Sequence, residues 1–198
     1  MNKLITILGA SGVGKTTLAK ALHENAGFDL ALEEHVERPF QSLFKKDRSY
    51  AFVNQLDYLI YRAEQERRLR NGNQPALMDG GLDLDFHGFT RLFHAHGWLN
   101  DDEFELCRRF YLLTRSLLPL PDLIVILSAS TQTIRERLAC RNRINIASSE
   151  DAELVHNFLD EWLAALPAEK VLRIDTNTEG VDYADSIELI LRKAAVIR

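Results

Sequence analysis

Short apolar runs alternate along the chain with longer segments in which apolar residues recur every three or four positions. Within the run DLIVILS, the segment LIVIL is continuously apolar, as expected of a parallel strand that is covered on both faces. The longer segments have the length and the period of helices. The strand candidates are 4–8, 29–33, 75–79, 122–128 and 170–175, and the helix candidates are 15–26, 47–71, 83–98, 101–118, 131–140, 149–165 and 182–195.

This alternation predicts an α/β fold, in which a five-stranded parallel sheet is flanked by helices on both faces. Asn100 followed by Glu103 is typical of a helix N-terminus, and Pro119 is placed to end the same helix. Ligands of such sheets bind at the carboxyl ends of the strands. The residues that follow each apolar run are therefore the first candidates for a functional site.

Composition narrows the class of protein. A chain of 198 residues that is 46% hydrophobic and 27% charged suits one globular domain spanning residues 1–198. The net charge of −5 provides no basic field for nucleic acid, and no apolar run reaches the 18 residues of a membrane span. We expect a cytoplasmic protein with no nucleic-acid or membrane partner. Cys107 and Cys140 lack the spacing of a metal site, so we expect both to be small buried hydrophobes.

The first strand candidate runs into GASGVGKTT, which fits the phosphate-binding pattern G-x-x-x-x-G-K-[ST] between a strand and a helix. Backbone N–H groups of such a loop surround phosphate oxygens, and the helix N-terminus adds its positive end. The pattern predicts ATP binding, with Lys15 on the β- and γ-phosphates and the Thr16 hydroxyl on Mg²⁺. The predicted cofactor-binding residues are Gly9, Ala10, Ser11, Gly12, Val13, Gly14, Lys15, Thr16 and Thr17.

The second strand candidate ends in a pair of carboxylates, Glu33 and Glu34. Side chains alternate along a strand, so only one of the two can face the cleft at the carboxyl end of the sheet. A carboxylate there is placed to take a proton from an attacking hydroxyl. A solvated acidic strand end is the alternative reading of the same pair.

The helix candidate 47–71 carries Gln55 and Arg62, seven residues apart and therefore on one face, close to an apolar stripe. A buried amide or guanidinium needs partners, and Asp85 is a candidate carboxylate for Arg62. Two readings remain open, namely a structural pair at the edge of the stripe and a site that recognises a planar heterocycle. The apolar stripe is formed by Phe52, Leu56, Leu59 and Ala63.

Two further stretches carry charge near the ends of strands. Asp79 ends the run PALMD and is followed at once by Gly80 and Gly81.

The second stretch carries arginines. Guanidinium groups on a mobile loop can close over transferring phosphates, although a solvated basic face is also possible. The arginines concerned are Arg137, Arg141 and Arg143, with a lid at about 141–148.

These stretches together resemble the deoxynucleoside kinase family, over most of the chain. HAHGWLNDDEFELCRRFY and PLPDLIVIL are also similar to family segments. The resemblance implies a three-layer fold like that of P-loop nucleoside monophosphate kinases, a nucleoside-like small-molecule acceptor and a homodimer packed through helices. It also implies the roles of individual residues. Glu34 corresponds to the general base, Gln55, Arg62 and Asp85 to the groups that read the base, Asp79 to a support for Mg²⁺, and Arg137, Arg141 and Arg143 to the lid arginines.

Three positions depart from the family pattern, and all three belong to the sugar side. The family reads D/E-R-S where this chain reads D-G-G, so that Gly80 replaces the arginine that holds the 5′-hydroxyl. Phe44 and Ile146 stand where the family has a tyrosine and a glutamate that bind the 3′-hydroxyl. We expect an ATP-dependent nucleoside or deoxynucleoside kinase. A kinase for another small alcohol or for a nucleotide, and a nucleotide-binding regulatory module, remain alternatives.

Overall fold

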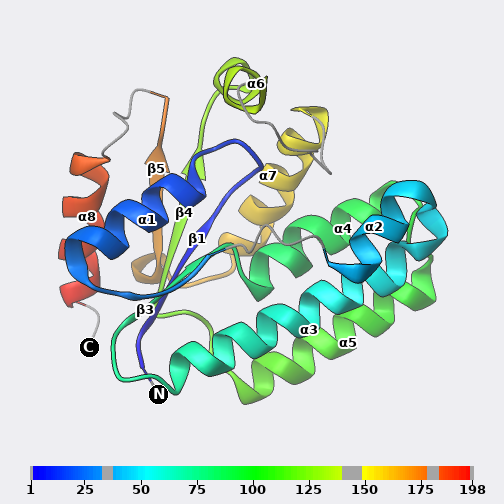
Figure 1. Cartoon of the computed structure of the whole chain (residues 1–198), viewed down its shortest axis with the longest axis horizontal. Helices are drawn as coiled ribbons and strands as arrows, with labels where there is room; N and C mark the ends of the chain where they lie inside the picture. The colour runs from blue at the N-terminus through cyan, green and yellow to red at the C-terminus, as the bar shows by residue number, and fades with distance from the viewer. Residues whose placement is uncertain (1, 33–37, 140–148, 178–182, 197–198) are drawn as a thin grey trace.

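The computed structural model describes residues 2–32, 38–139, 149–177 and 183–196, and Figure 1 shows their arrangement. Its strands form one parallel sheet in the order β2-β3-β1-β4-β5, which confirms the predicted α/β fold. β1 lies in the middle, between β3 and β4, where the order of the strands reverses. The strands are β1 Leu4–Leu8, β2 Asp29–Ala31, β3 Ala76–Asp79, β4 Leu123–Ser128 and β5 Val171–Asp175.

The helices pack on both faces of this sheet (Figure 1). Asn100 forms the expected capping box with Glu103 at the start of α5. Among the described residues, no helix is long and apolar enough to cross a membrane. The helices are α1 Lys15–Ala26, α2 Pro39–Lys46, α3 Ala51–Arg70, α4 Arg91–Ala95, α5 Asp101–Leu117, α6 Thr131–Ala139, α7 Ser149–Leu163 and α8 Ala184–Val196, with short helical turns η1 Arg48–Tyr50, η2 Leu84–Thr90 and η3 Ala168–Lys170.

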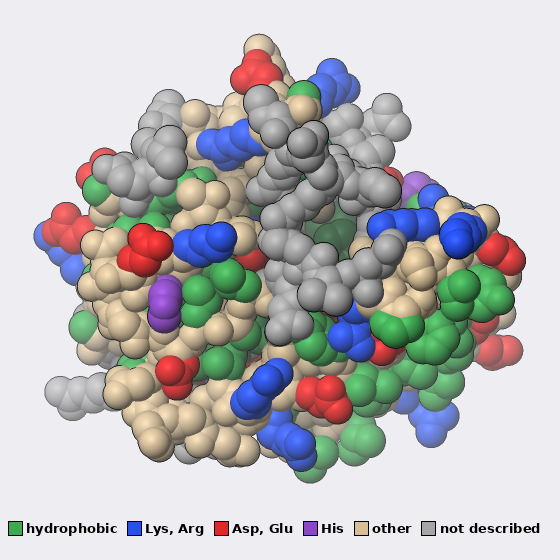
Figure 2. Space-filling model, in the orientation of Figure 1, with side chains coloured by type: hydrophobic (Ala, Val, Ile, Leu, Met, Phe, Trp, Pro, Cys, Tyr) green, Lys and Arg blue, Asp and Glu red, His purple; other side chains and the backbone are tan. Residues whose placement is uncertain are grey.

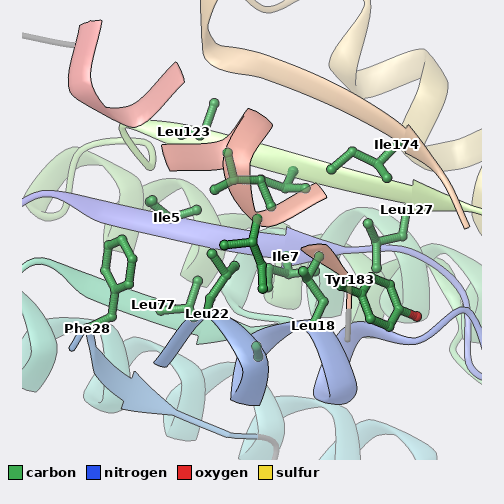
Figure 3. Packing of buried hydrophobic residues seen from close by; sticks show 14 of the residues in the cluster. Ile5, Ile7, Leu18, Leu22, Phe28, Leu77, Leu123, Leu127, Ile174 and Tyr183 are labelled. Atoms are coloured by element: carbon green, nitrogen blue, oxygen red, sulfur yellow. The ribbon is translucent and has the colours of Figure 1, made fainter. Parts of the chain in front are cut away.

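The faces of the sheet follow the alternation of side chains along β1. Ile5 and Ile7 pack with α1 and α8 in the cluster that Figure 3 shows. Leu8 packs on the opposite face with residues of α7, including Leu159. Both faces of β1 are therefore covered, which is why all five of its residues are buried. Cys107 is fully buried as expected, and burial raises the pKa of its thiol to about 12.

Two helical segments differ from the prediction. α2 was not predicted, because its eight residues are too few to show a clear helical period, although Pro39 stands at its first turn. The segment expected as one helix at 83–98 is a π-helix, η2, followed by the short α4. The Asp85 carbonyl accepts hydrogen bonds from the Gln55 amide (3.0 Å) and the Thr90 hydroxyl (2.8 Å). These hydrogen bonds from side chains to the Asp85 carbonyl accompany the wider turn of the π-helix.

The buried face of α3 is mostly polar. Of the predicted stripe only Leu59 is fully buried, whereas Phe52, Leu56 and Ala63 are partly exposed. Six polar side chains take the buried positions instead, and all are at most 3% exposed. They are Asn54, Gln55, Arg62, Gln65, Glu66 and Arg70.

Candidate active site

The loop between β1 and α1 forms the predicted phosphate cradle at the carboxyl edge of the sheet. α1 begins after Gly14, which offers no side-chain cap, so the first N–H groups of the helix remain available to an anion. Gly14 has φ +107°, and a Cβ at this position would collide with the hydroxyl of Tyr183. Only glycine fits both the backbone angle and the close approach.

Lys15 places its charge at the mouth of this loop. Its ammonium donates hydrogen bonds to the carbonyl oxygens of Gly9 (2.9 Å) and Ala10 (3.1 Å), and the residue is only 7% exposed. The loop backbone therefore orients the cation before any phosphate arrives. Ser11, Gly12, Val13 and Thr17 complete the loop and the first turn of α1.

Thr16 and Asp79 meet although they are 63 residues apart. The Thr16 hydroxyl donates to Asp79 Oδ2 at 2.6 Å, because β3 pairs with β1 and sets Ile7 beside Asp79. Asp79 is fully buried at the end of β3. A hydroxyl and a carboxylate are hard oxygen donors that Mg²⁺ accepts, with waters and phosphates completing its shell. The pair fits a magnesium ion, and these two residues are the ones that would hold it.

Arg137 braces the phosphate loop from α6. Its guanidinium donates to the Val13 carbonyl at 3.0 Å and to the Thr176 hydroxyl and carbonyl at 3.0 and 2.7 Å. The Thr176 hydroxyl itself contacts the Val13 carbonyl at 3.0 Å. Arg137, the one lid arginine that the structure describes, therefore lies beside the phosphate loop.

Thr176 and Tyr183 were not found from the sequence. Tyr183 has φ +52°, unusual for a residue other than glycine, and its ring packs near Leu18 and Leu127 (Figure 3). Neither residue belongs to a recognisable motif, and the contact of Tyr183 with Gly14 joins residues that are distant in sequence. No signal in the sequence points to it.

The predicted base-reading residues come together across α3 and η2. The Arg62 Nε donates to Asp85 Oδ2 at 3.0 Å, and both side chains are almost fully buried. The Gln55 amide reaches the Asp85 backbone, and Arg62 Nη1 donates to Gln65 Oε1 at 2.9 Å. Gln55, Arg62 and Asp85 thus form one connected polar wall. We call these three residues the acceptor wall.

Gly80 and Gly81 follow Asp79 and lie between the Thr16–Asp79 pair and the acceptor wall. Their φ angles are +79° and +124°, in the left-handed region that favours glycine. A Cβ at Gly80 would lie 3.4 Å from Arg62 Nη2. The space that the family fills with an arginine side chain therefore adjoins the guanidinium of Arg62.

The remaining predicted residues are placed as follows. Phe44 is fully buried and stacks on Phe93, with ring centroids 4.9 Å apart, in an aromatic cluster that also holds Trp98. Glu33, Glu34, Cys140, Arg141, Arg143, Ile146 and the lid at 141–148 lie outside the described residues.

Three features therefore lie at one edge of the sheet, namely the phosphate loop, the Thr16–Asp79 pair and the acceptor wall. A comparison of the whole chain with protein families agrees with this arrangement. The family model of deoxynucleoside kinases matches residues 5–196. The chain belongs to the deoxynucleoside kinase family. It is therefore a kinase, an enzyme that transfers phosphoryl groups.

Individual relatives extend this picture. The chain is 24% identical to the deoxyadenosine/deoxycytidine kinase of Bacillus subtilis (strain 168), covering 99% of this kinase and 93% of the relative. It is 30% identical to a putative adenylate kinase of Pyrococcus abyssi (strain GE5 / Orsay), covering 89% and 76%. The structure of deoxyadenosine kinase from M. mycoides with bound dATP has a TM-score of 0.77 and 23% identity, covering 96% of this chain and 98% of that one. This similarity supports the same fold.

Proposed function

We propose that this kinase transfers the γ-phosphoryl group of ATP to the 5′-hydroxyl of a nucleoside or deoxynucleoside. The observation that carries the proposal is the arrangement at one edge of the sheet, where the Thr16–Asp79 pair separates the phosphate cradle from the acceptor wall. A phosphate donor and a heterocyclic acceptor would then meet beside the metal pair. Family membership and the names of the relatives support the same acceptor class.

Each group has a role in this transfer. Lys15 and the N-terminus of α1 bind the phosphates, and Arg137 with Arg141 and Arg143 neutralises charge that develops on them. Thr16 and Asp79 would hold magnesium, which would neutralise phosphate charge during transfer. Glu34, which corresponds to the family's general base, takes the proton from the 5′-hydroxyl. Gln55, Arg62 and Asp85 orient the base, whereas Phe44, which is buried against Phe93 and Trp98, offers the sugar no polar group.

The test of the chemistry is a pair of neighbouring variants. Glu34→Gln should retain ATP binding and lose about 100-fold or more in transfer rate, the usual worth of a general base. Glu33→Gln should stay within about twofold of the wild type. Single-turnover kinetics with a panel of nucleosides measures both. The reverse pattern would assign the base to Glu33, and full activity of both variants would contradict a carboxylate base in this strand.

The sugar side supplies a second test. Phe44 and Ile146 cannot hydrogen-bond a 3′-hydroxyl, and rejection of an analogue is strong only where the site binds the missing group. A 3′-deoxynucleoside should therefore be used within about tenfold of its parent. A thousandfold loss of kcat/KM would show that other residues read the 3′ position.

A nucleoside monophosphate is the second candidate acceptor. Gly80 places no side chain beside Arg62 Nη2, and one relative is a putative adenylate kinase. Under this alternative Arg62 would contact the phosphate of the acceptor. Comparing kcat/KM for a nucleoside and its 5′-monophosphate decides between the two, because a tenfold or greater preference for the monophosphate (about 1.4 kcal/mol) would favour the nucleotide kinase.

We also propose a homodimer, which the family resemblance implies. Apolar side chains remain exposed on α3 and α5, and Figure 2 shows hydrophobic side chains gathered over this part of the surface. They include Ile60 on α3 and Leu106, Leu113 and Leu117 on α5, which are 41–68% exposed. Sedimentation should give twice the chain mass of 22.6 kDa. Leu113→Arg should give monomers, whereas Leu189→Arg on α8, also exposed, should leave the dimer intact.

A further inference from the structure

The side-chain oxygen of Asn54, on α3, is buried and has no hydrogen-bond partner among the described residues. The residue is 1% exposed, and its Oδ1 is one of the buried oxygens in the described structure that accept no hydrogen bond. The neighbouring buried amides differ in this respect. Gln55 donates to the Asp85 carbonyl, and Gln65 accepts from Arg62 and donates to the Tyr61 hydroxyl. Proteins seldom keep such an oxygen unpaired unless something else, often a ligand, completes its bonding.

The helical period places Asn54 beside the acceptor wall. Asn54, Tyr61 and Gln65 share one stripe of α3, because seven and eleven residues are close to whole turns. Gln55 and Arg62 form the adjoining stripe, and the hydrogen bond from Arg62 to Gln65 joins the two. Asn54 therefore stands at the N-terminal end of the stripe that holds Gln65, next to the stripe of Gln55 and Arg62, which contact Asp85.

The free oxygens in this region require a ligand group that donates hydrogen bonds. Asn54 Oδ1 can only accept, and the Nε2 of Gln55 already donates to the Asp85 carbonyl at 3.0 Å. No hydrogen bond within the described structure engages Gln55 Oε1. Consecutive residues therefore present two acceptor oxygens, and an exocyclic amino group has two N–H donors. The imide N–H of an oxo base offers only one donor, flanked by carbonyl oxygens that would repel both side chains.

We propose that Asn54 is a specificity-determining residue, which accepts a hydrogen bond from the exocyclic amino group of the acceptor base. The inference rests on the proposed function, because it presumes that a nucleoside occupies the acceptor wall. It narrows the substrate class to nucleosides with an amino-bearing base. Gln55 Oε1 takes the second N–H of the same group.

The test compares substrates that differ only in the amino group. For the wild type, kcat/KM should be at least about 100-fold higher for 2′-deoxyadenosine than for purine 2′-deoxyriboside, which carries hydrogen in its place. Asn54→Leu, of nearly the same size, should lower the value for deoxyadenosine about 10- to 100-fold and leave the other nucleoside within about threefold. If the enzyme prefers pyrimidines, deoxycytidine and its analogue without the 4-amino group form the equivalent pair.

A matched control separates this role from a structural one. Gln65→Leu removes a buried amide from the same stripe, but one that is satisfied within the protein, so it should lower both substrates alike and reduce the melting temperature. Asn54→Leu should raise the melting temperature, because it removes an unpaired buried oxygen.

Equal loss on both substrates in Asn54→Leu, or a lowered melting temperature with an unchanged preference for the amine, would overturn the inference while nucleoside phosphorylation stands. A wild type that phosphorylates no nucleoside of a full panel, deoxyguanosine included, would overturn the proposed function, and the inference with it.

Discussion

The two halves of α3 both bury polar side chains, but they do so differently. In the C-terminal half, Glu66 accepts hydrogen bonds from Arg70 and from both terminal nitrogens of Arg115, each at 2.9 Å. Asp83 accepts from Arg115 and from the Tyr111 hydroxyl. The negative charges of two carboxylates thus balance the positive charges of two guanidinium groups. We call these four side chains the closed network.

The N-terminal half is less complete. Arg62 pairs with Asp85, but Asn54 Oδ1 lacks a hydrogen-bond partner among the described residues, and Gly80 places no side chain next to Arg62. Burial of charge is similar in the two halves, so burial alone does not distinguish a site from a structural network. The distinguishing feature is whether the polar atoms find their partners within the chain.

The largest expected effect comes from opening the closed network. Glu66→Ala leaves Arg70 and Arg115 buried without their shared carboxylate, which should lower the free energy of unfolding by about 3–5 kcal/mol. Chemical denaturation measures this loss. The folded fraction should keep kcat/KM within about threefold, because the closed network holds no acceptor. A variant of normal stability that lost activity would break the distinction between the halves.

Removing a carboxylate from the acceptor wall should act on catalysis instead. Asp85→Ala takes away the partner of Arg62, and we expect kcat/KM to fall about 100-fold or more, which corresponds to about 2.7 kcal/mol. Folding should survive, with a smaller loss of stability than in Glu66→Ala. Steady-state kinetics alongside denaturation tests this. An Asp85→Ala variant that fails to fold would place the Arg62–Asp85 pair in the structural class.

His87 offers a test through pH. Burial, and then the charges of Arg91 and Arg115, lowers the pKa of His87 to about 3, and its ring stacks on Trp162. The unfolded chain binds a proton near pH 6.5 and the folded chain does not, so stability is lost as pH falls from about 6.5 towards 3. At pH 5 the loss should be about 2 kcal/mol. His87→Gln should remove that part of the pH dependence of unfolding, and an unchanged dependence would assign it to other groups.

The smallest expected effect concerns the space at Gly80. Gly80→Ala forces a side chain into a left-handed conformation, which costs about 1 kcal/mol and lowers the melting temperature by about 2–4 °C. Gly27→Ala is the matched control, because Gly27 also has a positive φ and has nothing within 4 Å of an added Cβ. Both variants should lose similar stability, and only Gly80→Ala should change kcat/KM. Identical kinetics for the two would show that the space at Gly80 does not face the acceptor.

Features that depend on local spacing can be predicted from the order of the residues. The phosphate loop, Lys15 and Thr16 follow from a short pattern after an apolar run, because backbone geometry at a strand–helix turn is set by neighbouring residues. The five parallel strands follow from apolar runs too short for helices. The link between Arg62 and Asp85 was also predicted, and the structure places them 3.0 Å apart.

Which buried polar residues have hydrogen-bond or ion-pair partners depends on the tertiary structure. Glu66 and Arg115 are 49 residues apart, and Gly14 meets Tyr183 from the far end of the chain, so no local pattern announces either contact. The helical period placed apolar residues on one side of α3, but packing against η2 and α5 buried its polar side, since partners for those charges come from other elements. Asn54 stands out only when all these partners are in place, because an unpaired oxygen is a property of the packed interior and not of the sequence.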